Sequence, residues 1–205
     1  MSPSHFKMPP EYQTLAAVRA RSSFAQPEAF GYDFRDWVSP YTKGAHCLHG
    51  IAIVLQDWAS AEWLRKVHRP EVQELGRDPT LRTNTRLEAL LRKVLGIGLS
   101  EVYATNAFPF VKPGGMSAPL AQSVVDATVA EYTAHELRIA SPRLVLAFGK
   151  LAANALQKSG IHHVNLPHPA ARIGALAAHE REWRNRLDMA AVSVAPSYGL
   201  VENDA

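Results

Sequence analysis

The run Ile51-Ala52-Ile53-Val54-Leu55 restricts the possible folds of this chain more than any other stretch. All five residues are apolar, three are β-branched, and no polar residue alternates with them. Such a run is typical of a strand buried on both faces, as in a parallel sheet. Gln56 and Asp57 follow directly. Because α/β folds bind ligands at the carboxyl ends of their strands, Asp57 is the first candidate for chemistry, with capping of the next helix as the alternative.

Similar apolar runs recur along the chain, and segments with helical periodicity separate them. The predicted strands cover residues 50–58, 101–106, 143–149 and 161–166. The predicted helices cover residues 63–67, 85–95, 119–139, 150–158 and 176–190. This alternation predicts an α/β fold with three α-β-α layers, in which helices flank a central four-stranded parallel sheet.

Local signals set the boundaries of these elements. We expect Trp58-Ala59-Ser60 to turn the chain away from the first strand. Thr85 and Glu88 have the spacing of a capping box, which predicts a helix start at Thr85. Residues 107–115 hold two prolines and two glycines and are predicted to form a loop. Pro119 suits the first turn of the long helix that follows.

The 205 residues, of which 47% are hydrophobic and 20% charged, predict a single domain over residues 1–205. Residues 1–45 are expected to be an arm that packs on this domain, with a short helix over residues 11–21. The aromatic residues expected to pack on the domain are Phe24, Phe30, Tyr32, Phe34, Trp37 and Tyr41. Residues 196–205 are expected to be a frayed tail.

The composition also limits location and cofactors. No apolar run approaches the ~20 residues that span a bilayer, and the N-terminus has no apolar signal core. The single cysteine, Cys47, excludes an internal disulfide, a cysteine zinc site and a cluster held by several thiolates, which favours a cytoplasmic location. A net charge of +3 permits a polyanionic partner without identifying one.

Several common motifs for nucleotide binding, catalysis and metal binding are missing from the sequence. No Gly-x-Gly-x-x-Gly, P-loop or Gly-x-Ser-x-Gly motif follows a predicted strand. His162 and His163 are adjacent in a predicted strand, so their side chains point to opposite faces and do not chelate one metal ion together. We therefore expect neither a metal ion nor another cofactor.

Polar residues follow all four predicted strands, and right-handed crossovers bring these strand ends to one edge of the sheet. They include a carboxylate, a carboxamide and an imidazole, which together favour a site over separate local caps. The residues expected at this edge are Gln56, Asp57, Thr105, Asn106, Gly149, Lys150, Asn165 and His168.

Four ordered motifs resemble the uracil-DNA glycosylase superfamily over roughly residues 48–190. Leu55-Gln56-Asp57-Trp58-Ala59-Ser60 is similar to the family's first motif, Gly-Gln-Asp-Pro-Tyr-His. Residues 105–114 are similar to its Thr-Asn strand end and Pro-rich loop, and residues 141–152 to its third strand. His168-Pro169-Ala170 is similar to its closing His-Pro-Ser motif.

This resemblance implies hydrolysis of the N-glycosidic bond to uracil, or to another deaminated base, in DNA repair. Asp57 would orient water or stabilise the cationic sugar, and His168 would donate a hydrogen bond to the departing base. Asn106 offers the donor and the acceptor needed to read the N3–H and O4 groups of uracil. The main chain of Gln56 would close the pocket.

The chain departs from the family motif beside Asp57. Leu55 replaces the first Gly, and Trp58-Ala59-Ser60 replaces Pro-Tyr-His, whose Tyr is implied to reject the methyl group of thymine. Trp58 is the bulky neighbour available for that task. No Phe lies between Asp57 and Phe108, so Trp58 and Phe108 are the candidate aromatics to contact the base.

Loops at the same edge are predicted to contact DNA. Lys112, Gly114 and Gly115 offer a cation and unhindered amides to phosphate. Lys150 begins a helix at this edge, where backbone N–H groups favour anions. Arg172 or Ile173 would enter the minor groove as a wedge.

Two other classes of function remain open from the sequence. One is a non-catalytic relative that binds damaged or single-stranded DNA, and the altered first motif motivates it. The other is a small-molecule enzyme acting on nucleosides or other glycosides. The leading hypothesis is a monomeric, metal-free DNA glycosylase.

Overall fold

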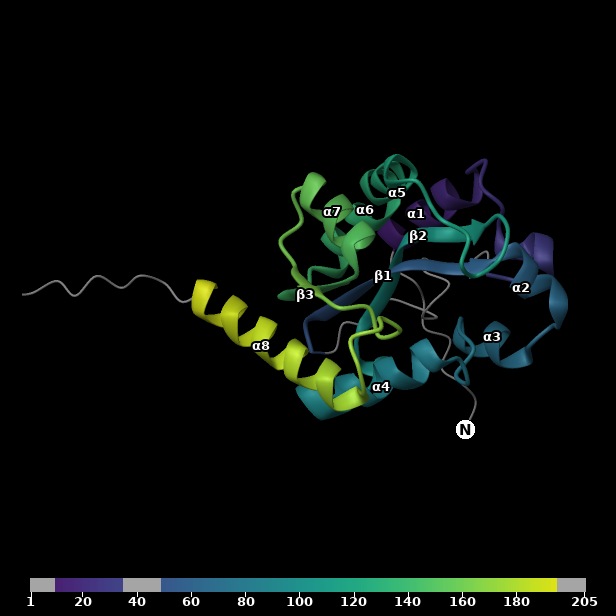
Figure 1. Ribbon diagram of the computed structural model, residues 1–205. Coiled ribbons are helices and arrows are strands. Elements are labelled where there is room, and N and C mark those ends of the chain that lie inside the picture. The colour runs from purple at the N-terminus through teal and green to yellow at the C-terminus, as the bar shows by residue number, and fades with distance from the viewer. Residues whose placement is uncertain (1–9, 35–48, 195–205) are drawn as a thin grey trace, which may run out of the picture.

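A computed structural model of the protein describes residues 10–34 and 49–194. A four-stranded parallel sheet forms its centre, with the strand order β2-β1-β3-β4. The strands are β1 (Ile51–Ser60), β2 (Tyr103–Lys112), β3 (Leu144–Phe148) and β4 (Val164–Leu166). Helices lie on both sides of this sheet (Figure 1). The predicted α/β fold is therefore confirmed.

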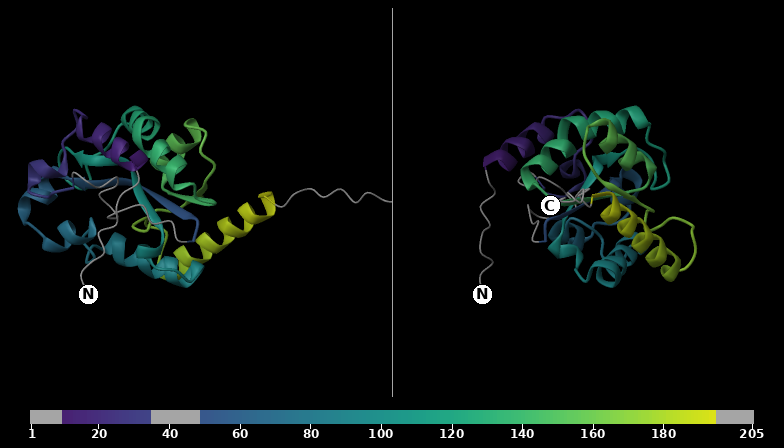
Figure 2. Two further views of the ribbon diagram at one scale, coloured as in Figure 1. Left: turned by 180° about the vertical axis from the view of Figure 1, so that it is seen from behind. Right: turned by 90° about the vertical axis from the view of Figure 1, so that its left-hand side faces the viewer.

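The longer helices form two layers, one on each face of the sheet (Figures 1 and 2). One layer contains α1 (Pro10–Ala20), α5 (Gln122–Thr128), η3 (Val129–Thr133), α6 (Ala134–Ala140) and α7 (Lys150–Lys158). The other contains α4 (Arg82–Leu95) and α8 (Leu176–Val194). Shorter helices are η1 (Pro27–Phe30), α2 (Ala61–Lys66), α3 (Pro70–Leu75) and η2 (Leu99–Glu101). In the described ranges, none of these helices has the length and apolar character needed to cross a membrane.

The apolar run of β1 is buried on both faces, which explains its lack of polar alternation. Ala52 and Val54 belong to the apolar cluster beneath α1, α5 and α7. Ile53 and Leu55 belong to the cluster beneath α4 and α8. β1 therefore lies in the core between two helical layers, and its polar end emerges at the sheet edge.

The described part of the N-terminal arm packs on the body of the protein. α1 lies where the sequence predicts a short helix. Tyr32 and Phe34 are fully buried, and the ring of Phe34 meets the ring of Trp58 edge-on at 5.5 Å. Trp37 and Tyr41 lie outside the described residues. The arm thus contributes apolar support directly behind the end of β1.

β2 continues through residues 107–112, where the sequence predicted a loop. Pro109 motivated that prediction, because proline does not donate to the hydrogen-bond ladder of a sheet. β2 is an edge strand, however, and its register with β1 shifts between Asp57 and Ala59. Edge strands and bulges both tolerate proline. The prediction was wrong because composition does not show whether a strand lies at an edge.

Other boundaries also differ from the predictions, and β4 begins at Val164, three residues after its predicted start. β1 runs through Ser60 and does not turn at Trp58. α4 begins at Arg82, and the hydroxyl of Thr85 donates to the carbonyl of Arg82 (3.2 Å), so the predicted capping box is not formed. α5 begins at Gln122, one turn later than Pro119 suggested.

A π-helical turn, η3, interrupts the long helical run and holds the part of β2 that carries Asn106. The hydroxyl of Thr133 donates to the carbonyl of Asn106 (2.9 Å), and the hydroxyl of Thr128 donates to that of Ala107 (2.7 Å). Buried carbonyls of an edge strand need such partners, because no further strand supplies them. The helical run thereby fixes the backbone at the end of the apolar part of β2.

A buried carboxyl group lies under the same helices. Glu136 of α6 is fully buried and accepts a hydrogen bond from the hydroxyl of Thr105. Burial raises the pKa of Glu136 to about 8, although Thr105 and the charge of Arg19 act in the opposite direction. The folded protein therefore keeps this carboxyl group protonated at pH values where the unfolded chain ionises it.

This protonation difference predicts a pH-dependent stability. Between about pH 4.5 and pH 8, the free energy of unfolding should fall with rising pH by about 1.4 kcal/mol per pH unit from this group. Glu136→Gln should remove that component and make the variant more stable than the wild type at the upper end of the window. Urea unfolding across the window measures it. Glu131→Gln, at an exposed position of the same helical run, is the control; an unchanged slope in Glu136→Gln would contradict the prediction.

Candidate functional site

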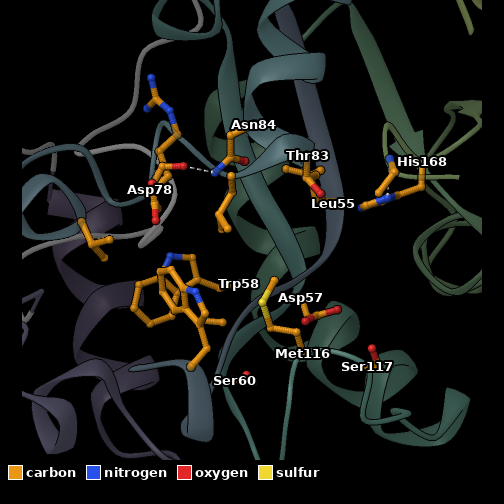
Figure 3. Close-up of a pocket in the computed structure, with 16 residues that line it drawn as sticks. Leu55, Asp57, Trp58, Ser60, Asp78, Thr83, Asn84, Met116, Ser117 and His168 are labelled. Atoms are coloured by element: carbon orange, nitrogen blue, oxygen red, sulfur yellow. Dashed lines mark hydrogen bonds between the residues drawn. The ribbon is translucent and has the colours of Figure 1, made fainter. Parts of the chain in front are cut away.

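A cavity of about 300 Å³ lies at the carboxyl ends of the strands, where α/β folds place their ligand sites. Its walls come from the end of β1, from α2, α3 and the start of α4, and from the loops that follow β2 and β4. Asp57, Trp58 and His168 all line it (Figure 3). The fold therefore brings three of the predicted site residues to one cavity.

The carboxylate of Asp57 is held by two donors. The amide nitrogen Nε2 of Gln56 donates to Oδ1 (3.0 Å), and Nζ of Lys112 lies 2.9 Å from Oδ2. The Asp57 side chain keeps 18% of its surface exposed. The N-cap of α2 is Ser60, so the alternative role of Asp57 as a helix cap is not realised. Asp57 presents an oriented negative charge to the cavity.

The ring of His168 is oriented by its own loop. Its Nδ1 accepts a hydrogen bond from the backbone N–H of Ala170 (3.2 Å). In the neutral ring the proton then sits on Nε2, which is the donor left for a ligand. Burial lowers the pKa of His168, and the nearby His179 adds to this, whereas the charge of Asp57 raises it. His168 is therefore a neutral donor that shares the cavity with a carboxylate.

Two helices hold the loop that carries His168. The guanidinium of Arg86 in α4 donates to the carbonyl of Pro169 (3.2 Å), and Nε2 of His179 in α8 lies 3.1 Å from the carbonyl of Ala171. A Cβ on Gly149 would lie 3.8 Å from the Cβ of His168. Sequence reasoning missed Arg86 and His179, because no local pattern links them to a loop so distant along the chain.

Asn106 is buried in the sheet beside this cavity. It is the register partner of Leu55, which lines the cavity, whereas Asn106 does not. Both polar atoms of its carboxamide are buried, and neither has a hydrogen-bond partner among the described residues. Thr105 bonds instead to Glu136 beneath α6. Since a buried amide without partners costs stability, Asn106 is a candidate for binding a polar ligand.

The two candidate aromatic residues lie in different places. The indole N–H of Trp58 donates to the carbonyl of Gly76 (2.7 Å), which fixes the ring in the cavity wall. Phe108 is buried, and its ring lies 5.2 Å from that of Phe24 and 5.6 Å from that of Phe110. Phe108 does not line the cavity, so its predicted contact with a base is not supported.

Two of the predicted DNA contacts need correction. Lys112 is only 3% exposed and pairs with Asp57, so its ammonium group is not available to a phosphate. A Cβ on Gly115 would lie 3.0 Å from Oε2 of Glu62, whose carboxylate repels a phosphate at this place. The backbone carbonyl of Gly114 accepts from the N–H of Glu62 (3.1 Å), which does not involve the amide of Gly114, so its contact with DNA stays a prediction. The composition of this loop favoured a phosphate site, but the carboxylates of Asp57 and Glu62 beside it disfavour one.

The remaining predicted DNA contacts are exposed. Lys150 begins α7 directly after Gly149, on the side of the sheet edge that carries His168. Arg172 and Ile173 project from the loop after β4, and Ile173 is 42% exposed. These positions are compatible with contacts to a macromolecule at the cavity mouth, and their role stays a prediction.

Other cavity residues come from segments that the sequence did not indicate as part of a site. They include Trp63 and Arg77, and also Asp78, Thr83, Asn84, Met116 and Ser117, which Figure 3 labels. Asp78 is a second carboxylate, but Arg69 and Thr80 already occupy its oxygens. Among the residues that the structure describes, no three His, Cys, Asp or Glu side chains gather closely enough to hold a metal ion.

A family model described as the uracil DNA glycosylase superfamily matches residues 65–189 of the chain, which is more than half of its length. The matched region includes Asn106, the loop after β2 and His168, and it begins after Asp57. No curated protein matches the chain.

Because the carboxamide of Asn106 is buried without a partner, we expect it to lower the stability of the free protein. Asn106→Leu should raise the free energy of unfolding by about 1–3 kcal/mol, because it removes a desolvated amide without breaking a hydrogen bond. Asn84→Leu is the control: Asn84 is also buried, but its Nδ2 donates to the carbonyl of Asp78 (2.6 Å), so this variant should be destabilised. Denaturant unfolding compares the two. A loss of stability in both would contradict the proposed state of Asn106.

The charge of Asp57 acts on His168 and should be visible in a titration. An NMR titration of the ring protons should give His168 a pKa below the usual value of about 6.5. Asp57→Asn should lower this pKa further, since it removes the negative charge that favours the imidazolium in the described part of the chain. A pKa that stays the same or rises in Asp57→Asn would mean that the two groups do not face each other.

Proposed function

The chain belongs to the uracil DNA glycosylase superfamily, and from this premise we propose that it hydrolyses the N-glycosidic bond of a flipped-out uracil, or of another deaminated base, in DNA. Membership supports a glycosylase-type hydrolase and a DNA partner in general. The observation that carries the finer proposal is one cavity with an oriented carboxylate, Asp57, and a neutral imidazole donor, His168.

The two side chains suit the two charges that develop when this bond breaks. The bonding electrons leave with the base, which becomes anionic, while the sugar becomes cationic and then takes up water. The carboxylate of Asp57 stabilises the cationic sugar or orients the water. The Nε2–H of His168 donates to a carbonyl oxygen of the departing base. A neutral imidazole does this without adding a second cation beside the sugar.

Asn106 supplies base recognition in this proposal. Its carboxamide pairs with the N3–H and O4 groups of uracil, which would satisfy the donor and the acceptor that lack partners in the free protein. Leu55 stands where the family motif has Gly, and it lines the cavity beside Asn106. Asn106 itself is fully buried and does not line the cavity, so in this proposal side chains of the cavity wall move before the base reaches it.

The DNA must present the base outside the stack, at a cost of roughly a few kcal/mol. Arg172 and Ile173, exposed on the loop after β4, are the residues assigned to hold the duplex open. The product is an abasic site, so the proposed role is the first step of base excision repair. A monomeric state and a cytoplasmic location are parts of the same proposal.

A second candidate function is binding of damaged or single-stranded DNA without hydrolysis. Two observations favour it: Asn106 does not line the cavity, and Phe108 is packed in the core. The residues that would recognise a base are therefore less well placed than Asp57 and His168, the residues that would cleave the bond.

The decisive assay uses a labelled oligonucleotide that contains one uracil, single- or double-stranded, followed by alkali to cleave abasic sites. The wild type should produce the broken strand, and Asp57→Ala should lower the single-turnover rate by about 10²–10³-fold. Asp188→Ala, which removes an exposed carboxylate on α8, should keep the wild-type rate. No strand break with either substrate, together with salt-dependent DNA binding, would replace the first candidate with the second.

A further inference from the structure

Lys112 is the last residue of β2, and its side chain is unusually buried for a lysine. Its side chain is 3% exposed, and Nζ lies 2.9 Å from Oδ2 of Asp57. The same nitrogen donates to the backbone carbonyl of Met116 (2.6 Å). One ammonium group thus joins the candidate catalytic carboxylate to the loop after β2.

The burial of this pair distinguishes it from the exposed ion pairs of the protein. Lys158 and Asp126 also lie 2.9 Å apart, but the Lys158 side chain is 71% exposed, and such pairs contribute little to stability. In a buried pair, removing one partner leaves an uncompensated charge in a poorly solvated place. The positions of Asp57 and Lys112 are therefore strongly interdependent.

The contacts of Lys112 leave the rest of the carboxylate available. Gln56 donates to Oδ1 and Lys112 to Oδ2 of Asp57, so two donors fix the plane of the group. An ionised carboxylate has about four acceptor sites, and the others remain for water or for the sugar. Asp57 is consequently oriented before any substrate arrives.

The bond to Met116 extends this effect to the cavity wall. Met116 and Ser117 line the cavity opposite the start of α4 (Figure 3). Gly114 adopts a left-handed backbone (φ 74°), which turns the chain back toward the cavity directly after β2. Lys112 ties this turn to Asp57, so the wall and the carboxylate keep one relative position.

We propose that Lys112 is a positioning residue, which orients the carboxylate of Asp57 for bond cleavage and anchors the Met116 loop without touching DNA. This role rests on the proposed glycosylase function. It replaces the contact with phosphate that the sequence suggested for Lys112. A small displacement of a reacting group costs about 10²-fold in rate, which sets the size of the expected effect.

The test compares Lys112→Met with the wild type in two measurements. The single-turnover rate of uracil release should fall about 10²-fold, while the affinity for the same oligonucleotide and its dependence on salt stay unchanged. Lys158→Met, which removes the lysine of the exposed pair, should change neither quantity. If Lys112→Met does not fold, Lys112→Gln, which can still donate a hydrogen bond, takes its place in the comparison.

A double variant shows whether Lys112 acts through Asp57. In the Asp57→Asn background, Lys112→Met should lower the residual rate no further, because the group that it positions has been removed. The double variant should also be more stable than Asp57→Asn alone, since it leaves no unpaired buried ammonium group. Additive losses of rate would overturn the proposal.

Other outcomes would also overturn it. An unchanged rate with a weaker salt dependence of DNA binding would make Lys112 a phosphate contact. A covalent adduct with abasic DNA, trapped by borohydride and absent in Lys112→Met, would make it a nucleophile. If the folded wild type releases no base, the proposed function itself fails. A different result is an active wild type with an inactive Asp57→Asn variant and a full rate in Lys112→Met. That result refutes the positioning role of Lys112 and leaves the proposed function intact.

Discussion

The parallel pairing of β1 with β2 is the constraint on which the candidate site depends. The pairing extends from Ala52 opposite Tyr103 to Ser60 opposite Lys112, well past the point where β3 stops pairing with β1. This long two-stranded extension carries Asp57 and Trp58 on one strand and Asn106 and Lys112 on the other. A register shift beside Pro109 is the only irregularity in the pairing. Apart from His168, the candidate groups of the site therefore come from two paired strand ends.

The polar groups near this pairing differ in how they are compensated. Lys112 and Asp57 neutralise each other, and Thr105 donates to the protonated carboxyl group of Glu136. Asn106, between them in the sheet, has no hydrogen-bond partner in the described part of the chain. Other buried polar atoms also lack a partner there, among them Nε and Nη1 of Arg19, but Asn106 leaves both a donor and an acceptor unpaired beside the candidate site, at a cost in stability that is typical of a binding site.

Much of the architecture could be predicted, because it follows from short-range patterns. The apolar run before Gln56 identified β1, and the spacing from Lys150 to Lys158 identified α7 at its observed bounds. The start of α4 and the end of β2 were missed for different reasons. Thr85 satisfies a local pattern that the helix does not use, because the helix already begins at Arg82. Pro109 disfavours a strand unless that strand lies at an edge of the sheet, which only the assembled sheet shows.

The sequence by itself determined the α/β class, the strand order along the chain and the delivery of Asp57 and His168 to one edge, because burial patterns and crossover handedness are encoded locally. Only the tertiary structure decided which side chains meet. It placed Lys112 on Asp57, Phe108 in the core and Leu55 at the cavity beside Asn106. These outcomes depend on the edge position and register of β2 and on distances between segments far apart in sequence. The sequence around Lys112 does not show whether its ammonium group meets a phosphate or the carboxylate of Asp57, because that depends on how β1 and β2 pair.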